Sequence, residues 1–129
     1  MRKNQNNQYY LKDKKIQLIT KIIDKDYVEL GYKYIVDGYV WAYAKQLSQD
    51  QIYEARTHGE AENRLFVLNY RTDLKLYDFI AYKDKYYTIT RIDTTDDYNT
   101  DMYIYTIDTP MGDTREDIQP ADYVIPTDD

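Results

Sequence analysis

Seven residues in the first half of the chain read Tyr39-Val40-Trp41-Ala42-Tyr43-Ala44-Lys45. Small or branched side chains at positions 40, 42 and 44 alternate with large aromatic rings at positions 39, 41 and 43. A period of two is typical of a β-strand whose two faces meet different surroundings. The segment therefore predicts a strand with one small-residue face and one aromatic face.

Other strand patterns lie on both sides of this segment. In the first of them, Ile16, Leu18, Thr20 and Ile22 share one face. The segment from Tyr27 to Ile35 is ambiguous because Gly31 interrupts it. That first strand is expected to run from Lys14 to Ile23. The other expected strands are Leu65 to Tyr70, Met102 to Ile107, and the two arms of a hairpin at Tyr82 to Ile89 that turns at Lys83-Asp84-Lys85.

A short helix is expected directly after the aromatic strand. Ser48 and Gln51 have the spacing of a capping box, and Gln49 to Arg56 contains strong helix formers that end near Gly59. We therefore expect a mainly β fold, either a barrel or a sandwich. Closure is the simpler way to avoid exposed strand edges, so we favour a small antiparallel β-barrel of about six strands, with one short helix inserted between strands and extended termini.

Five segments occur in the order found in one family of proteins. They are Val40-Trp41-Ala42, Leu47-Ser48 with the helical 51–55, Phe66 to Arg71, Tyr77 to Ile80, and Tyr86 to Ile92. Together they cover about half of the chain. This order resembles the phage head-tail joining family, the head-completion or stopper proteins of long-tailed bacteriophages.

The resemblance implies a structural virion protein of the phage neck, made in the host cytoplasm. Such a protein closes the DNA-filled head and provides the docking surface for the tail. Its partners would be further copies of itself in a ring, dodecameric by resemblance, with portal and adaptor proteins above and a tail-terminator or tail-completion protein below. No cofactor is expected.

In the resembled family, the insertion between two barrel strands projects into the channel and gates the packaged DNA. The corresponding segment here, Leu47 to Asn63, is acidic. An acidic plug would block DNA by bulk and repulsion without binding it tightly. The candidate gating residues are Gln49, Asp50, Gln51, Tyr53, Glu54, Arg56, His58 and Glu60.

Composition limits the classes of partner. The 129 residues carry 17 Lys and Arg against 23 Asp and Glu, for a net charge of −6, and there is no cysteine. The negative net charge disfavours a protein that binds nucleic acid through its phosphates. The absence of cysteine rules out disulfides and thiolate zinc sites. One domain is expected, with no apolar membrane span and no signal peptide.

Tyrosine dominates the aromatic content, with 17 Tyr beside 2 Phe and 1 Trp. Tyrosine suits the boundary between a core and an interface, because its ring is apolar and its hydroxyl can reach water or a neighbour. A β-rich fold with a tyrosine bias is the equally supported alternative. Stacking on single-stranded nucleic acid would need a basic groove, which this acidic chain does not predict.

The two ends carry opposite charge, which divides the chain into a basic arm (1–13), a barrel domain (14–109, with the insertion at 48–63) and an acidic tail (110–129). Charge at each end is expected to steer the docking of neighbouring layers, while apolar residues in the tail are expected to anchor it on a neighbour or on the barrel. The alternative is two solvated tails. The candidate partner-binding residues are Arg2, Lys3, Tyr9, Tyr10, Ile118, Tyr123, Val124 and Ile125.

Catalytic motifs are weak, and we do not expect an enzyme. His58 stands without a second histidine or any cysteine. Asp97, Asn99 and Asp101 have the spacing of a calcium loop, but Met102 stands where that loop requires glycine, so a metal site is the weaker alternative to an acidic turn. The competing hypothesis to the neck protein is a free-standing β-barrel binding module, or a tail-tube or tail-completion component, that recognises a protein or glycan ligand.

Overall fold

The fold is described from a computed structural model, which describes residues 10–47, 62–94, 100–110 and 117–126. These ranges contain eight strands and no α-helix. The helix expected at 48–59 lies outside the described residues. The strands are β1 (Lys14–Ile23), β2 (Glu29–Tyr34), β3 (Val40–Gln46), β4 (Arg64–Asn69), β5 (Phe79–Tyr82), β6 (Lys85–Thr94), β7 (Asp101–Asp108) and β8 (Ile118–Gln119).

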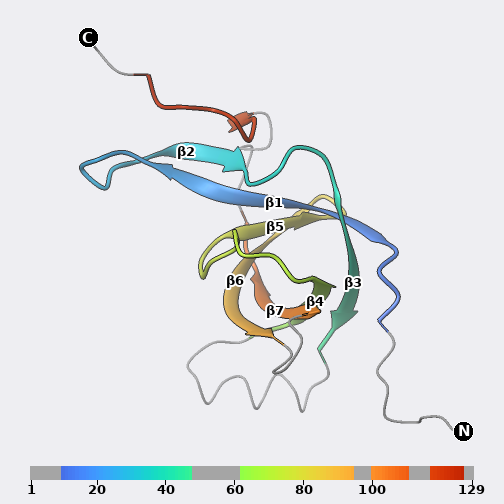
Figure 1. Ribbon diagram of the computed structural model, residues 1–129. Helices are drawn as coiled ribbons and strands as arrows, with labels where there is room; N and C mark the ends of the chain where they lie inside the picture. The colour runs from blue at the N-terminus through green and yellow to red at the C-terminus, as the bar shows by residue number, and fades with distance from the viewer. Residues whose placement is uncertain (1–9, 48–61, 95–99, 111–116, 127–129) are drawn as a thin grey trace, which may run out of the picture.

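Six of these strands form a closed antiparallel barrel in the order β1-β3-β4-β7-β6-β5, returning to β1 (Figure 1). Strand β1 closes the ring because it pairs with a different strand on each edge. Lys14–Ile16 pairs with Val40–Ala42 of β3, and Gln17–Ile19 pairs with Phe79–Ala81 of β5. The expected mainly β fold with a small antiparallel barrel of about six strands is therefore confirmed.

The barrel interior is filled from the faces that the alternation predicts. Ile16 and Leu18 of β1 are fully buried with Ala42 of β3. Phe66 of β4 stands at the centre of the aromatic packing, with its ring centroid 5.6 Å from that of Tyr82 and 5.4 Å from that of Tyr87. Edge-to-face pairs at this distance add to the stabilisation that burial provides.

The hairpin between β5 and β6 turns where the sequence predicts it. Lys83 and Asp84 form the turn, with φ of +50° and +65°. Two successive left-handed residues are typical of a type I′ turn, whose twist matches that of the flanking strands.

A second hairpin, formed by β1 and β2, leaves the barrel (Figure 1). The latter half of β1, Ile19 to Ile23, pairs with β2. The ambiguous segment 27–35 is thus mostly strand, and Gly31 is accommodated within it with φ of +138°. Strand β8 adds in parallel to β2, with Ile118 opposite Tyr32.

The aromatic face of the 39–45 segment points outward. The Trp41 side chain is 52% exposed, whereas Ala42 is fully buried. Small residues face the interior here because bulky side chains from β4 and β5 already occupy it.

We expect Trp41→Ala to lower the free energy of unfolding by less than about 2 kcal/mol, because half of the ring is already in water. The matched variant Phe66→Ala removes a fully buried ring and should cost about 3 to 5 kcal/mol. Urea denaturation of both variants measures the difference. Equal losses would mean that Trp41 is a core residue.

Candidate assembly surfaces

The first candidate surface is the tip of the β1–β2 hairpin, residues Asp24–Leu30, here called the hairpin tip. The Asp24 carboxylate organises the turn: its Oδ1 accepts hydrogen bonds from the backbone N–H groups of Asp26 (2.8 Å) and Val28 (2.9 Å). An aspartate that satisfies backbone donors in this way fixes the turn locally.

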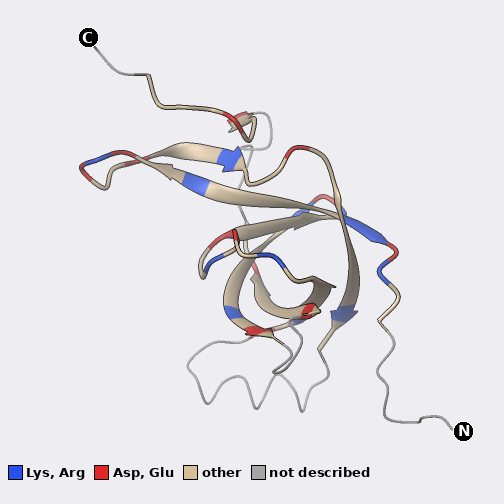
Figure 2. Cartoon of the chain, in the orientation of Figure 1, with Lys and Arg blue, Asp and Glu red and all other residues tan. Residues whose placement is uncertain are grey.

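The hairpin tip exposes apolar side chains. Tyr27 is 87% exposed, and Val28, Leu30 and the adjacent Ile23 are also exposed. Single exposed apolar residues are common on protein surfaces, but a group of them marks an interaction site. Carboxylates surround the group, because Asp24, Asp26 and Glu29 stand against one lysine, Lys25 (Figure 2).

The second candidate surface lies at the other end of β1 and is here called the lysine–aromatic face. It comprises Lys15, Tyr39, Trp41, Lys83 and Lys85. The Lys15 ammonium lies 5.4 Å from the ring centroid of Tyr39 and 5.5 Å from that of Trp41, within the range of cation–π attraction.

A cavity of about 180 Å³ opens on the lysine–aromatic face. Lys15 and Tyr39 line one side of it, and the β5–β6 turn at Lys83 and Asp84 lines the other. The cavity thus combines aromatic rings and ammonium groups. Such a lining suits an aromatic or acidic group of a ligand.

Of the N-terminal partner candidates, the structure describes Tyr10, which packs on its own barrel. Its ring centroid lies 5.1 Å from that of Tyr43 and 5.5 Å from that of Tyr103. Burial, together with a hydrogen bond to Tyr103, raises the pKa of Tyr10 to about 12. Lys12 extends this attachment with a 2.7 Å ion pair to Asp101. Arg2, Lys3 and Tyr9 lie outside the described residues.

The C-terminal candidates run along the β1–β2 hairpin of their own chain. Ile118 packs against the cluster of Ile19, Phe79 and Tyr86. The backbone N–H of Ala121 donates to the Asp37 carboxylate at 3.0 Å, which fastens the segment to the β2–β3 connection.

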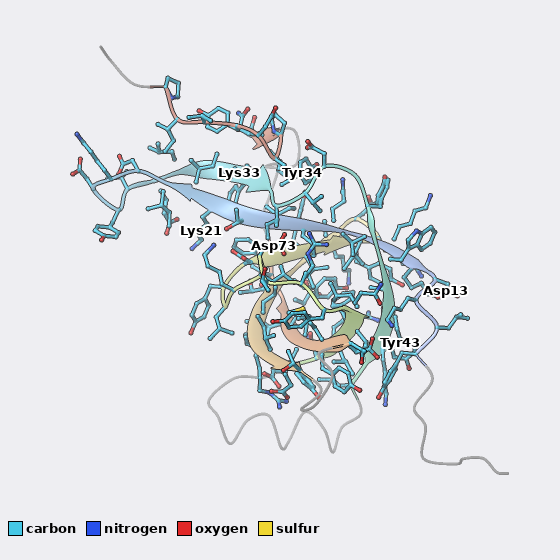
Figure 3. All side chains as sticks on the ribbon, viewed as in Figure 1. Asp13, Lys21, Lys33, Tyr34, Tyr43 and Asp73 are labelled. Atoms are coloured by element: carbon cyan, nitrogen blue, oxygen red, sulfur yellow. The ribbon has the colours of Figure 1, made fainter. Side chains whose placement is uncertain are left out.

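Farther along, Tyr123, Val124 and Ile125 border a hollow beside Lys21 and Lys33, two residues that lie on β1 and β2 (Figure 3). Within one chain the tail therefore lies along the β1–β2 hairpin that projects from the barrel. Val124 is nevertheless 78% exposed and remains available to a partner.

The two ends of the expected gate meet at the barrel wall. The Leu47 N–H donates to the Asn63 carbonyl at 3.1 Å. Glu62 is buried and accepts hydrogen bonds from Thr90 (2.9 Å) and from Arg91 (3.0 Å). Arg91 in turn lies 3.7 Å from the ring centroid of Tyr105.

The candidate gating residues themselves lie outside the described residues. They are Gln49, Asp50, Gln51, Tyr53, Glu54, Arg56, His58 and Glu60.

The weaker metal hypothesis gains no support from the residues that are placed. Asp97 and Asn99 lie outside the described residues, and the Asp101 carboxylate is engaged by Lys12. In ranges 10–47, 62–94, 100–110 and 117–126, no three His, Cys, Asp or Glu side chains are grouped as metal ligands. The same ranges hold no helix that is long and apolar enough to cross a membrane.

Sequence reasoning did not single out the hairpin tip or the lysine–aromatic face. In the sequence, Asp24-Lys25-Asp26 indicates only the end of the first expected strand, and Lys83-Asp84-Lys85 predicts only a hairpin turn. The one feature of the sequence that could have indicated them is the occurrence of charged residues next to aromatic residues, both at the hairpin tip and at the β5–β6 turn. That signal gains meaning only once the chain fold places Tyr39 beside Lys15 and Lys83.

Comparison with known proteins gives a fold and no family. No family model and no curated protein matches the chain. The solution structure of protein SF1141 from Shigella flexneri 2a is similar, with a TM-score of 0.57 and 14% sequence identity over 77% of this chain and 94% of that one. At this identity the likeness concerns the fold alone.

Two N-terminal deletions test the attachment at Tyr10. Removing residues 1–12 should lower the free energy of unfolding by about 1 to 3 kcal/mol more than removing residues 1–9, since only the longer deletion takes away Tyr10 and Lys12. Thermal or urea denaturation of both chains measures the difference. Identical stabilities would show that the Tyr10 contacts do not hold the arm to the barrel.

Proposed function

We propose that this protein is a structural component of a phage neck, a head-tail connector or stopper. It closes the DNA-filled head as a ring of identical copies and provides the docking surface for the tail. The observation that carries the proposal is the projecting hairpin, whose tip exposes a group of apolar side chains beyond a closed barrel. A protein that acts as a single copy gains nothing from this exposure, whereas a ring former buries it.

The segments that resemble the head-tail joining family support the same proposal. Val40–Ala42 lies in β3, Phe66–Asn69 in β4 and Tyr86–Ile92 in β6, so these pieces belong to one closed barrel. These three segments are strands of the same barrel, although the insertion and other segments separate them along the chain. The resemblance therefore concerns a coherent structural unit.

The ends of the described chain favour contacts with two different layers. Tyr10 lies by the β3 and β7 side of the barrel, and the segment 117–126 runs along β2 on the other side (Figure 1). A basic arm and an acidic tail that leave from separate places can reach separate partners. We assign the portal and adaptor proteins to one side and the tail-terminator or tail-completion protein to the other.

The gate belongs to this proposal. The insertion 47–63 begins and ends at hydrogen-bonded neighbours, because Leu47 directly follows β3 and Asn63 directly precedes the adjacent β4. A segment attached in this way can carry acidic residues into a channel while the barrel stays intact. Packaged DNA then meets repulsion and bulk, without a basic surface to hold it.

One observation favours the alternative, a free-standing module that binds a protein or glycan ligand. The cavity on the lysine–aromatic face is lined by Tyr39, Tyr82 and three lysines. Aromatic rings beside polar groups also suit small ligands. A monomer that binds a ligand there would not need the exposed hairpin tip.

Light scattering of the full-length chain, alone and with a purified portal–adaptor complex, tests the neck proposal. We expect a discrete ring, either alone or on the complex, because the exposed apolar tip requires a partner. A chain that stays monomeric at high concentration and does not associate with the complex would instead support the binding module.

The gate is tested in assembled particles. Replacing residues 48–61 by a short Gly/Ser connection should leave folding intact, because Leu47 and Asn63 already lie side by side. Filled heads that carry this variant should lose DNA, measured as nuclease-sensitive DNA released from particles. Normal retention of DNA in such particles would remove the gating role and leave the ring role standing.

A further inference from the structure

We infer that the hairpin tip of one copy docks on the lysine–aromatic face of the next copy, head to tail around the ring. This inference rests on the proposed function and names the interface that would build the ring. Three observations carry it: where the two surfaces lie, how their charges and shapes match, and the conformation of Tyr27.

The two surfaces lie at opposite ends of strand β1. Lys15 belongs to the lysine–aromatic face, and Ile23 adjoins the hairpin tip, eight residues farther along the same strand. At about 3.3 Å per residue this separation is about 26 Å. The two surfaces therefore cannot meet within one molecule, but each is available to a neighbour. Figure 2 shows acidic residues at the hairpin tip and lysines where β1 begins.

The charges of the two surfaces are complementary. The hairpin tip carries Asp24, Asp26 and Glu29 against Lys25, and Glu29 also pairs with Lys21 of the same hairpin at 3.3 Å, so its excess charge is negative. The lysine–aromatic face carries Lys15, Lys83 and Lys85 against Asp84, with Lys85 also paired to Asp108 at 3.6 Å, so its excess charge is positive. Opposed patches of this kind steer association and exclude tip-to-tip or face-to-face contact, where like charges would meet.

The shapes are also complementary. The cavity on the lysine–aromatic face measures about 180 Å³, and a protein cavity of about 150 Å³ suffices to hold a benzene molecule. It can therefore take one aromatic ring. Tyr27 is the most exposed large hydrophobic side chain of the described residues, at the end of the hairpin. Placed in the cavity, its ring would lie among Lys15, Tyr39 and Tyr82.

The backbone of Tyr27 is the third observation. Its φ is +64°, a left-handed conformation that glycine or asparagine adopts at lower cost than a bulky side chain. Within its own chain the ring is almost wholly in water. A partner that buries this ring would offset the cost of holding it there.

An interface between two different surfaces of identical chains is heterologous. Such contacts repeat until they close into a ring, or continue as an open filament if the rotation between copies does not close. The inference therefore predicts that a copy with one blocked surface can still bind a neighbour through its other surface.

Two variants block the two surfaces separately. The tip variant is Asp26→Lys with Tyr27→Gly, which spares the turn-forming Asp24 and suits the left-handed backbone. The face variant is Trp41→Ala with Lys83→Glu, both at exposed positions. A matched control, Tyr77→Gly with Asp93→Lys, changes an exposed tyrosine with a left-handed backbone and an exposed acid, neither of which belongs to either surface. Circular dichroism confirms that each variant is folded.

Light scattering then compares the wild-type chain, each variant and the mixture of both. We expect an oligomer for the wild type and the control, and a monomer for each variant alone. The equimolar mixture should form a species of twice the monomer mass and stop there, because one intact tip meets one intact face.

The other results of the light-scattering experiment would contradict the interface, the closed ring or the neck proposal, as follows. Rings from both variants would overturn this interface and leave the neck proposal intact. Loss of assembly in the face variant alone would mean that a different segment occupies the cavity, which also overturns the pairing. Open filaments of the wild type that both variants abolish would support the interface and contradict the closed ring. A wild type that is monomeric at all concentrations, alone and on the portal–adaptor complex, would overturn both.

Discussion

The pairing of strand β1 with three other strands is the constraint on which the rest of the structure depends. Its first residues bond to β3 and its middle to β5, which closes the barrel, and its last residues bond to β2, which builds the projection. Thr20 in the same strand donates a 2.6 Å hydrogen bond to the buried Asp78 carboxylate, which fastens the 70–78 loop. Strand β1 therefore belongs both to the barrel core and to the projecting β1–β2 hairpin. The barrel thus fixes the direction in which the hairpin projects.

A two-stranded hairpin is only marginally stable in water, so the projection needs support beyond its own hydrogen bonds. The C-terminal segment supplies it. Strand β8 pairs with Tyr32 and Lys33 on the outer edge of β2, and Ile118 closes the small cluster around Ile19 and Phe79. This addition also covers part of an edge that would otherwise invite strand pairing with other chains. The end of the chain thus supports the root of the hairpin and leaves its tip exposed.

Local patterns predicted most strands, because alternation reports directly which face is buried. The segment Lys14–Ile23 and the turn at Lys83-Asp84 were found in this way. The alternation pattern could not predict which strands pair with one another. The partners of β1 are distant in sequence, and alternation gives the buried face of a strand but not the neighbouring strand at each of its edges. Trp41 shows the same limit: its alternation with Ala42 separates two faces, but only the filled barrel decides that the small residues point inward. The exposed hairpin tip was not predicted because a short acidic run has the same composition in an ordinary turn as in an interaction surface.

The tyrosine content separates into roles once the fold is known. Tyr82, Tyr86 and Tyr87 are buried, as a β-rich core requires. A second group packs outside the barrel wall, where Tyr10, Tyr43, Tyr103 and Tyr105 surround Leu47, Leu65 and Val67. Compositional bias accounts for both groups, because each serves one chain alone. Tyr27, Tyr39, Tyr70 and Tyr77 are exposed instead. Of these, Tyr27 and Tyr39 stand near opposite ends of β1, one beside carboxylates and the other beside a lysine. In the docking that we infer, the interface role falls to Tyr27 and Tyr39.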